Sequence, residues 1–145
     1  MKKYVTLGVF LVGVLVFSGC SSGVAGGTRL KTSPVFGVVQ VDGEPVAGVT
    51  VECYPEAGAS EKKSPIITAA DVHGKFSFTT YQFGDGLPEG AYRLAFKWKP
   101  ITAGGQDKLN GAYAEPAESK YKVTVVAGQP NDLGTIELST KGPGR

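Results

Sequence analysis

The chain has 145 residues, enough for one domain with a buried core and too few for two. Its formal charge of +2 comes from Lys2 and Lys3, because the remaining 13 basic residues are balanced by 13 acidic ones. This balance argues against a protein that binds nucleic acid through a basic surface. The 21 glycines and 9 prolines are spread along the chain, a pattern typical of short strands joined by tight turns.

Residues 1–19 have the pattern of an export signal. Lys2 and Lys3 precede fourteen uncharged, mostly apolar residues, Tyr4 to Phe17. A membrane-spanning helix needs about 20 such residues, so this run is short for one. We therefore expect 1–19 to be a signal peptide.

The residues around Cys20 resemble the processing site of bacterial lipoproteins. Phe17, Ser18 and Gly19 lead into Cys20 as in a lipobox, although Leu is more usual at the position that Phe17 occupies. The resemblance implies that Cys20 is diacylated, with palmitate-type chains, and becomes the new N-terminus of an envelope protein. Ser21 after the cysteine favours the outer membrane in a two-membrane bacterium. An uncleaved helical anchor and a soluble secreted product are the alternatives.

A second interpretation of the same stretch is a serine-hydrolase elbow, since Gly19 to Gly23 fits the pattern G-x-S-x-G. Such an elbow needs a strand before the serine and a helix after it. Ser21 instead follows the predicted signal peptide and precedes a run of small residues, and His73 is the sole histidine of the chain. We therefore expect no catalytic residue, no cofactor and no enzymatic activity.

After Cys20 the chain divides into a Gly/Ser-rich tether over 20–33, a domain over 34–140 and a disordered tail over 141–145. Within the domain, apolar residues alternate with polar ones at a period of two, which predicts strands. The predicted strands are Val35–Val41, Val49–Tyr54, Ile66–Ala69, Phe76–Thr79, Tyr92–Trp98, Tyr121–Val125 and Leu133–Leu138. We predict an all-β fold, a seven-stranded antiparallel β-sandwich.

Three segments of the domain resemble the carboxypeptidase regulatory-like domains, which have a transthyretin-like (prealbumin-like) fold. The opening hairpin over 37–51 contains the turn dipeptide Asp42-Gly43, the segment 68–78 places Asp71 and Gly74 before an aromatic strand, and 87–94 resembles a third signature. The resemblance covers about Val35 to Leu138 and implies an accessory or binding module, with no catalytic residues to transfer.

Loop aromatics are the candidate binding residues. The segment 100–119 is long for a loop, and long loops are often functional. Tyr81, Phe83 and Tyr113 lie in predicted loops, whereas Tyr92, Phe96 and Trp98 share the parity of core residues.

The remaining reactive residues have structural interpretations. Cys53 shares the inward parity of its strand and has no disulfide partner if Cys20 is acylated, so we expect a buried thiol. His73, Asp42, Asp85 and Glu89 lie in turns, without the spacing of a metal site.

The sequence thus predicts a non-enzymatic β-sandwich protein that is exported and anchored to the membrane by its N-terminal lipid. Its role is structural, or it binds another envelope protein. The alternative is a module that binds peptidoglycan or another polysaccharide through loop aromatics.

Overall fold

The computed structural model describes residues 29–58, 64–100 and 104–143. The predicted signal peptide 1–19, the predicted lipidation site Cys20 and most of the tether lie outside the described residues. No helix within the described ranges is long and apolar enough to cross a membrane. The longer strands are β2 (Val35–Val41), β4 (Val49–Pro55), β5 (Ile66–Ala69), β6 (Lys75–Ser77), β8 (Gly90–Trp98), β9 (Lys122–Val125) and β10 (Asn131–Leu138). The short elements are β1 (Thr32–Ser33), β3 (Glu44–Pro45), β7 (Leu87–Pro88) and the 3-10 helices η1 (Glu56–Gly58) and η2 (Pro116–Glu118).

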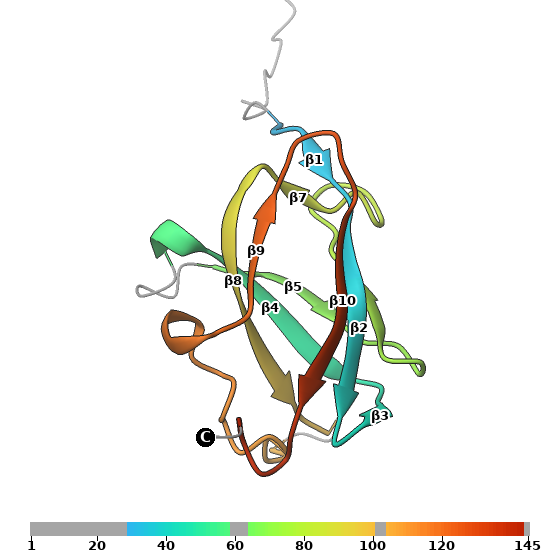
Figure 1. Cartoon of the computed structure of the whole chain (residues 1–145), viewed down its shortest axis with the longest axis vertical. Coiled ribbons are helices and arrows are strands. Elements are labelled where there is room, and N and C mark those ends of the chain that lie inside the picture. The colour runs from blue at the N-terminus through green and yellow to red at the C-terminus, as the bar shows by residue number, and fades with distance from the viewer. Residues whose placement is uncertain (1–28, 59–63, 101–103, 144–145) are drawn as a thin grey trace, which may run out of the picture.

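Two four-stranded sheets form the two layers of the fold (Figure 1). In one sheet β2 pairs with β10 on one side and with β3 and β6 on the other, and the second sheet has the order β5-β4-β8-β9. Inward residues of both sheets form one core, in which Val39, Val51 and Phe96 are fully buried. Burial of each such side chain stabilises the fold by about 1.5–3 kcal/mol. The prediction of an all-β sandwich is confirmed, and the longer strands match the seven predicted ones.

The first hairpin shows why its sequence folds as predicted. Val41 pairs with Glu44, so that Asp42 and Gly43 alone form the loop. Both have a positive φ, 53° and 87°, as the hairpin turn that matches strand twist requires. The Asp42 carboxylate also accepts hydrogen bonds from the hydroxyl groups of Ser139 and Thr140, at 2.8 and 2.7 Å. These bonds join the turn to the end of β10.

One strand pair departs from the predicted antiparallel arrangement: β10 runs parallel to β2. The connection after β9 crosses from one sheet to the other at the upper end of Figure 1, so β10 starts at the same end as β2. Asn131 pairs with Val35 and Leu138 with Val41, with a register shift between Asp132 and Thr135. Local alternation predicts each strand but not the direction of a partner that is distant in sequence.

The boundaries of the domain differ from the prediction at both ends. Thr32 and Ser33, assigned to the tether, form β1 and pair with β7. Ser33 is buried, and its Oγ accepts a hydrogen bond from the Gly128 N–H at 2.8 Å. At the other end, Gly142 of the predicted disordered tail donates its N–H to the Ser139 carbonyl at 3.0 Å. Hydrogen bonds thus hold Thr32, Ser33 and Gly142 to the domain, whereas the prediction rested on the low apolar content of the two segments.

Candidate binding groove

One carboxylate holds the part of the loop between β8 and η2 that the structure describes after residue 103. Asp107 accepts hydrogen bonds from the backbone N–H groups of Trp98, Leu109 and Gly111, at 2.8, 3.1 and 3.1 Å. The Leu109 side chain is fully buried in the core. A long polar loop is therefore held as a defined wall beside β8.

This wall also covers the edge of β8 that β9 leaves unpaired. The N–H groups of Leu94 and Phe96 donate to the carbonyl groups of Tyr121 and Tyr113, each at 2.9 Å. Buried backbone groups need such partners. The two bonds fix the backbone of both tyrosines beside β8. The loop and the residues before β9 consequently enclose a groove.

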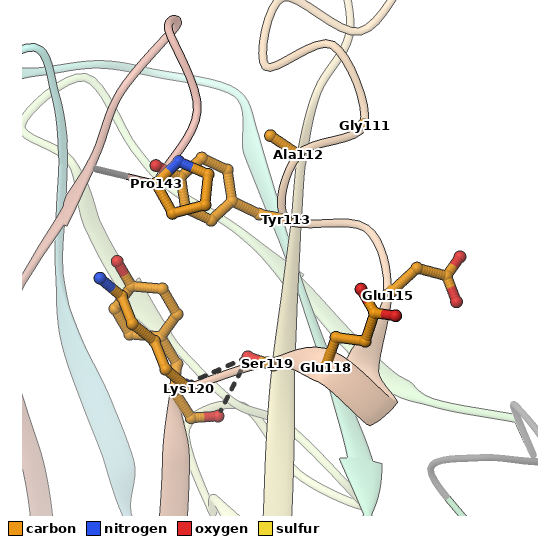
Figure 2. A pocket seen from close by; sticks show the side chains of 9 residues that line it. Gly111, Ala112, Tyr113, Glu115, Glu118, Ser119, Lys120 and Pro143 are labelled. Atoms are coloured by element: carbon orange, nitrogen blue, oxygen red, sulfur yellow. Dashed lines mark hydrogen bonds between the residues drawn. The ribbon is translucent and has the colours of Figure 1, made fainter. Parts of the chain in front are cut away.

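The groove has a volume of about 330 Å³ (Figure 2). A volume of this size is at the lower end of the range of small-ligand sites. The side chains that give it its chemical character are Tyr113, Glu115, Glu118, Lys120, Tyr121 and Pro143. Tyrosine rings thus form its inner part, while acidic and basic groups lie at its rim.

Hydrogen bonds to β10 and to Ser139, the residue after it, fix both tyrosines. The Tyr121 hydroxyl donates to the Glu137 carbonyl at 2.7 Å, and the Tyr113 hydroxyl accepts the Ser139 N–H at 3.0 Å. The two ring centroids lie 6.3 Å apart, and Phe96 packs edge-on against Tyr121. The inner wall of the groove is therefore positioned before any ligand arrives.

The electrostatics of the groove favour a protonated Tyr121 and a charged rim. Burial, with smaller effects of Tyr113 and Glu137, raises the pKa of the Tyr121 hydroxyl, which therefore stays a donor at neutral pH. Glu115 and Glu118 are exposed, and the Lys120 ammonium lies 5.3 Å from the centroid of the Tyr121 ring. The acidic rim attracts cationic groups, and Lys120 covers one aromatic face.

The structure does not bring the three predicted loop aromatics together. Tyr113 lines the groove but is only 9 % exposed, whereas Tyr81 and Phe83 lie in the loop between β6 and β7. Figure 1 shows these two loops at opposite ends of the sandwich. Alternation along the strands and the predicted loops indicate which side chains lie outside the core. They do not indicate at which end of the molecule a loop lies.

The other candidates have structural surroundings. Cys53 is fully buried, as predicted, and burial raises the pKa of its thiol. The Asp71 carboxylate accepts the backbone N–H groups of His73 and Lys75, at 2.8 and 2.9 Å, which makes it a turn-forming residue. Over the described ranges, no three His, Cys, Asp or Glu side chains converge as metal ligands do.

Sequence reasoning missed a polar cluster on the outer face of the second sheet. Glu52 and Tyr54 alternate with core residues and yet are buried themselves. Lys97 Nζ lies 2.7 and 2.8 Å from the two carboxylate oxygens of Glu52, and the Tyr54 hydroxyl donates to Glu52 at 3.0 Å. Burial and the neighbouring carboxylate raise the pKa of Tyr54 to about 12. In the sequence, Glu52 and Lys97 both fall at outward positions of their strands. That pattern predicts an ion pair only when the register of the two strands is known.

Comparison with known proteins shows similarity of structure only. No family model matches the chain, and a search of curated proteins found no match. Among solved structures, a DUF3823 family protein from Bacteroides ovatus is 17 % identical with a TM-score of 0.42, over 71 % of this chain and 43 % of that one. A DUF3823 family protein from Parabacteroides merdae is 18 % identical with a TM-score of 0.41, over 77 % and 46 %. Klebsiella pneumoniae 5-hydroxyisourate hydrolase is 16 % identical with a TM-score of 0.43, over 76 % and 92 %.

The chain thus spans less than half the length of the two DUF3823 proteins. At these identities and scores the similarity carries no argument about activity or ligand. The fold assignment rests on the sheet topology described above, and membership in the carboxypeptidase regulatory-like family stays a prediction.

Proposed function

We propose that this chain is an exported lipoprotein, anchored through Cys20 in the outer membrane, whose β-sandwich presents the groove to a segment of another envelope protein. The lipobox-like residues before Cys20 support the anchor. The observation that carries the binding role is the groove itself, with Tyr113 and Tyr121 held in place by β10. Preorganised sites of this kind lose little entropy on binding.

The groove suits a polypeptide that carries a lysine or arginine. Stacking of a sugar needs an open aromatic face, but Tyr113 is mostly buried and Lys120 covers Tyr121. Glu118 instead offers an exposed carboxylate at the rim, which accepts strong hydrogen bonds from cationic side chains.

Carbohydrate binding is the second candidate, because tyrosine and carboxylate side chains line the same groove. Tyrosine edges and carboxylates also suit sugar hydroxyl groups, which donate to carboxylate oxygens. Neither candidate requires catalysis. The one thiol of the described residues, that of Cys53, is buried in the core and offers no accessible nucleophile.

Site-specific photocrosslinking in living cells tests the binding role. A photoreactive amino acid replaces Ala112, which is exposed in the groove, or Val72, which is exposed in the turn between β5 and β6. We expect a discrete protein adduct from the Ala112 position only, and its loss when Glu118→Lys is added. Equal adducts from both positions would contradict the proposal. Binding to a glycan array that Glu118→Lys abolishes would assign the groove to a polysaccharide instead.

A further inference from the structure

Exposed apolar side chains gather at one end of the molecule. Among the described residues, four of the seven large hydrophobic side chains that are exposed belong to this end, Leu30, Tyr81, Phe83 and Val126. Leu30 is 61 % exposed, Val126 50 % and Phe83 100 %. We call these four residues the apical patch, because they belong to the segments next to β1, β7 and the end of β9, which lie at the upper end of Figure 1.

The apical patch comes from three segments that are joined by hydrogen bonds. β1 pairs with β7, which connects the residues around Leu30 to the loop that carries Tyr81 and Phe83. The Leu30 N–H also donates to the Tyr81 hydroxyl at 3.2 Å. The turn that begins at Val126 is held by the bond from the Gly128 N–H to Ser33 Oγ. The patch is therefore one surface of the domain rather than a set of unrelated loop tips.

The loop that carries Phe83 is internally fixed. The Asp85 carboxylate accepts the backbone N–H groups of Thr80, Tyr81 and Gln82, at 2.8, 3.0 and 3.1 Å. These three bonds lower the pKa of Asp85 although burial opposes them. The fully exposed phenyl ring of Phe83 is thus presented by an ordered loop, and apolar surface of this kind marks an interaction site.

The short chain before the apical patch brings this end close to Cys20. Only eight residues separate Cys20 from Arg29, which corresponds to a reach of at most about 30 Å and a root-mean-square span of about 16 Å. A lipid on Cys20 would therefore hold this end of the domain within reach of the bilayer. Arg29 and Lys31 flank the exposed Leu30, and basic residues beside apolar ones suit an anionic lipid surface.

We propose that the apical patch contacts the membrane directly, with Phe83 and Leu30 in the interfacial region and Arg29 and Lys31 at the lipid phosphates. The inference rests on the lipid anchor of the proposed function. Insertion is shallow, because the exposed carboxylate of Glu89 follows β7 at the same end and stays in water. The groove lies beside η2 and the start of β9, away from the upper end of Figure 1 where β1 and β7 lie, so this contact leaves it open to water.

Tryptophan quenching by lipid tests the inference with the full-length protein. The protein is reconstituted in phosphatidylethanolamine and phosphatidylglycerol vesicles that contain a lipid with a nitroxide near the top of its acyl chain. Trp98 is the sole tryptophan, so the wild type gives the background signal. Phe83→Trp reports on the apical patch, and Val72→Trp is the matched control because Val72 is 73 % exposed in a different turn.

We expect the nitroxide lipid to quench Phe83→Trp and to shift its emission to the blue, and to leave Val72→Trp at the wild-type level. Equal quenching of the two variants, or none, would overturn the inference. A blue shift of Phe83→Trp that depends on protein concentration without lipid would also overturn it, because a second copy would then cover the patch. Palmitate labelling of the same preparations separates the two proposals. Labelled protein without selective quenching leaves the anchor standing, whereas unlabelled protein refutes the anchor itself.

Discussion

The bond from Tyr121 to β10 allows a sharp test of how the groove is held. Tyr121→Phe keeps the ring and its edge-on contact with Phe96 and removes only the hydroxyl that donates to the Glu137 carbonyl at 2.7 Å. A typical hydrogen bond contributes about 0.5–1.5 kcal/mol. Glu137 itself is exposed, so that water can replace the lost donor, and we expect the lower half of that range. For a domain of this size, a loss of about 0.5–1 kcal/mol lowers Tm by about 2–8 °C.

Thermal unfolding followed by circular dichroism measures this effect, with Tyr81→Phe as the matched control. The Tyr81 hydroxyl only accepts an exposed N–H, that of Leu30, at 3.2 Å, so its removal is expected to lower Tm less. The Tyr121→Phe protein should also give a weaker photocrosslink from Ala112, because the inner wall of the groove is less well fixed. A Tm loss no larger than that of Tyr81→Phe would refute the role assigned to this bond.

Three further predictions concern the buried Cys53 thiol, the close contact of Gly86 with the Ser33 carbonyl, and the stability of the fold in acid. Cys53, buried and with a raised pKa, should resist alkylation at mildly alkaline pH and react only in denaturant, and rapid labelling of the folded protein would contradict its burial. Gly86→Ala should lower Tm much more than Gly84→Ala. Both glycines have a positive φ, but only a Cβ at Gly86 would collide with the Ser33 carbonyl. Equal losses of Tm would disprove the collision. Asp71 has a lowered pKa, so its stabilisation is complete above the ordinary value of about 3.9 and is lost as pH falls through the folded-state value. Thermal scans between about pH 5 and pH 2 should therefore show a steeper loss of Tm for the wild type than for Asp71→Asn, and parallel curves would argue against this linkage.

The strands were predictable because their signals are local. Alternation of apolar and polar residues fixes which side chains of a strand face inward, and Asp42-Gly43 can form a two-residue turn without help from distant residues. The parallel pairing of β10 with β2 was not predictable in this way. It depends on a connection that crosses between the sheets. The residues of β2 and β10 do not themselves indicate that these two strands pair.

The site was predicted less well, for a related reason. The long loop was predicted to be functional, and its Tyr113 lines the groove, although no binding at this place is shown. Its ring is nevertheless buried, because its hydroxyl accepts a bond from Ser139, which lies 26 residues away in the sequence. Tyr121 was assigned to a strand and overlooked, although it forms the other half of the inner wall. Contacts between distant segments decide both cases, and composition and spacing do not contain them.

The proposal for the apical patch combines one feature of the sequence with one feature of the structure. The sequence supplies the predicted anchor at Cys20 and the short distance to Arg29. The structure adds that Phe83 and Val126 are exposed, and that their segments are joined to β1 by the pairing with β7 and by the bond from Gly128 to Ser33. Together they support the proposal that the apical patch faces the membrane.

Metabolic labelling with a clickable palmitate analogue tests the central claim, the lipid anchor, most directly. Wild type and Cys20→Ser are expressed side by side, and the label on each purified protein is compared at equal loading. The account predicts strong labelling of the wild type that survives detergent extraction, because the acyl chains are bound covalently, and no labelling of Cys20→Ser. Equal labelling of the two proteins, or an unlabelled wild type, would contradict it.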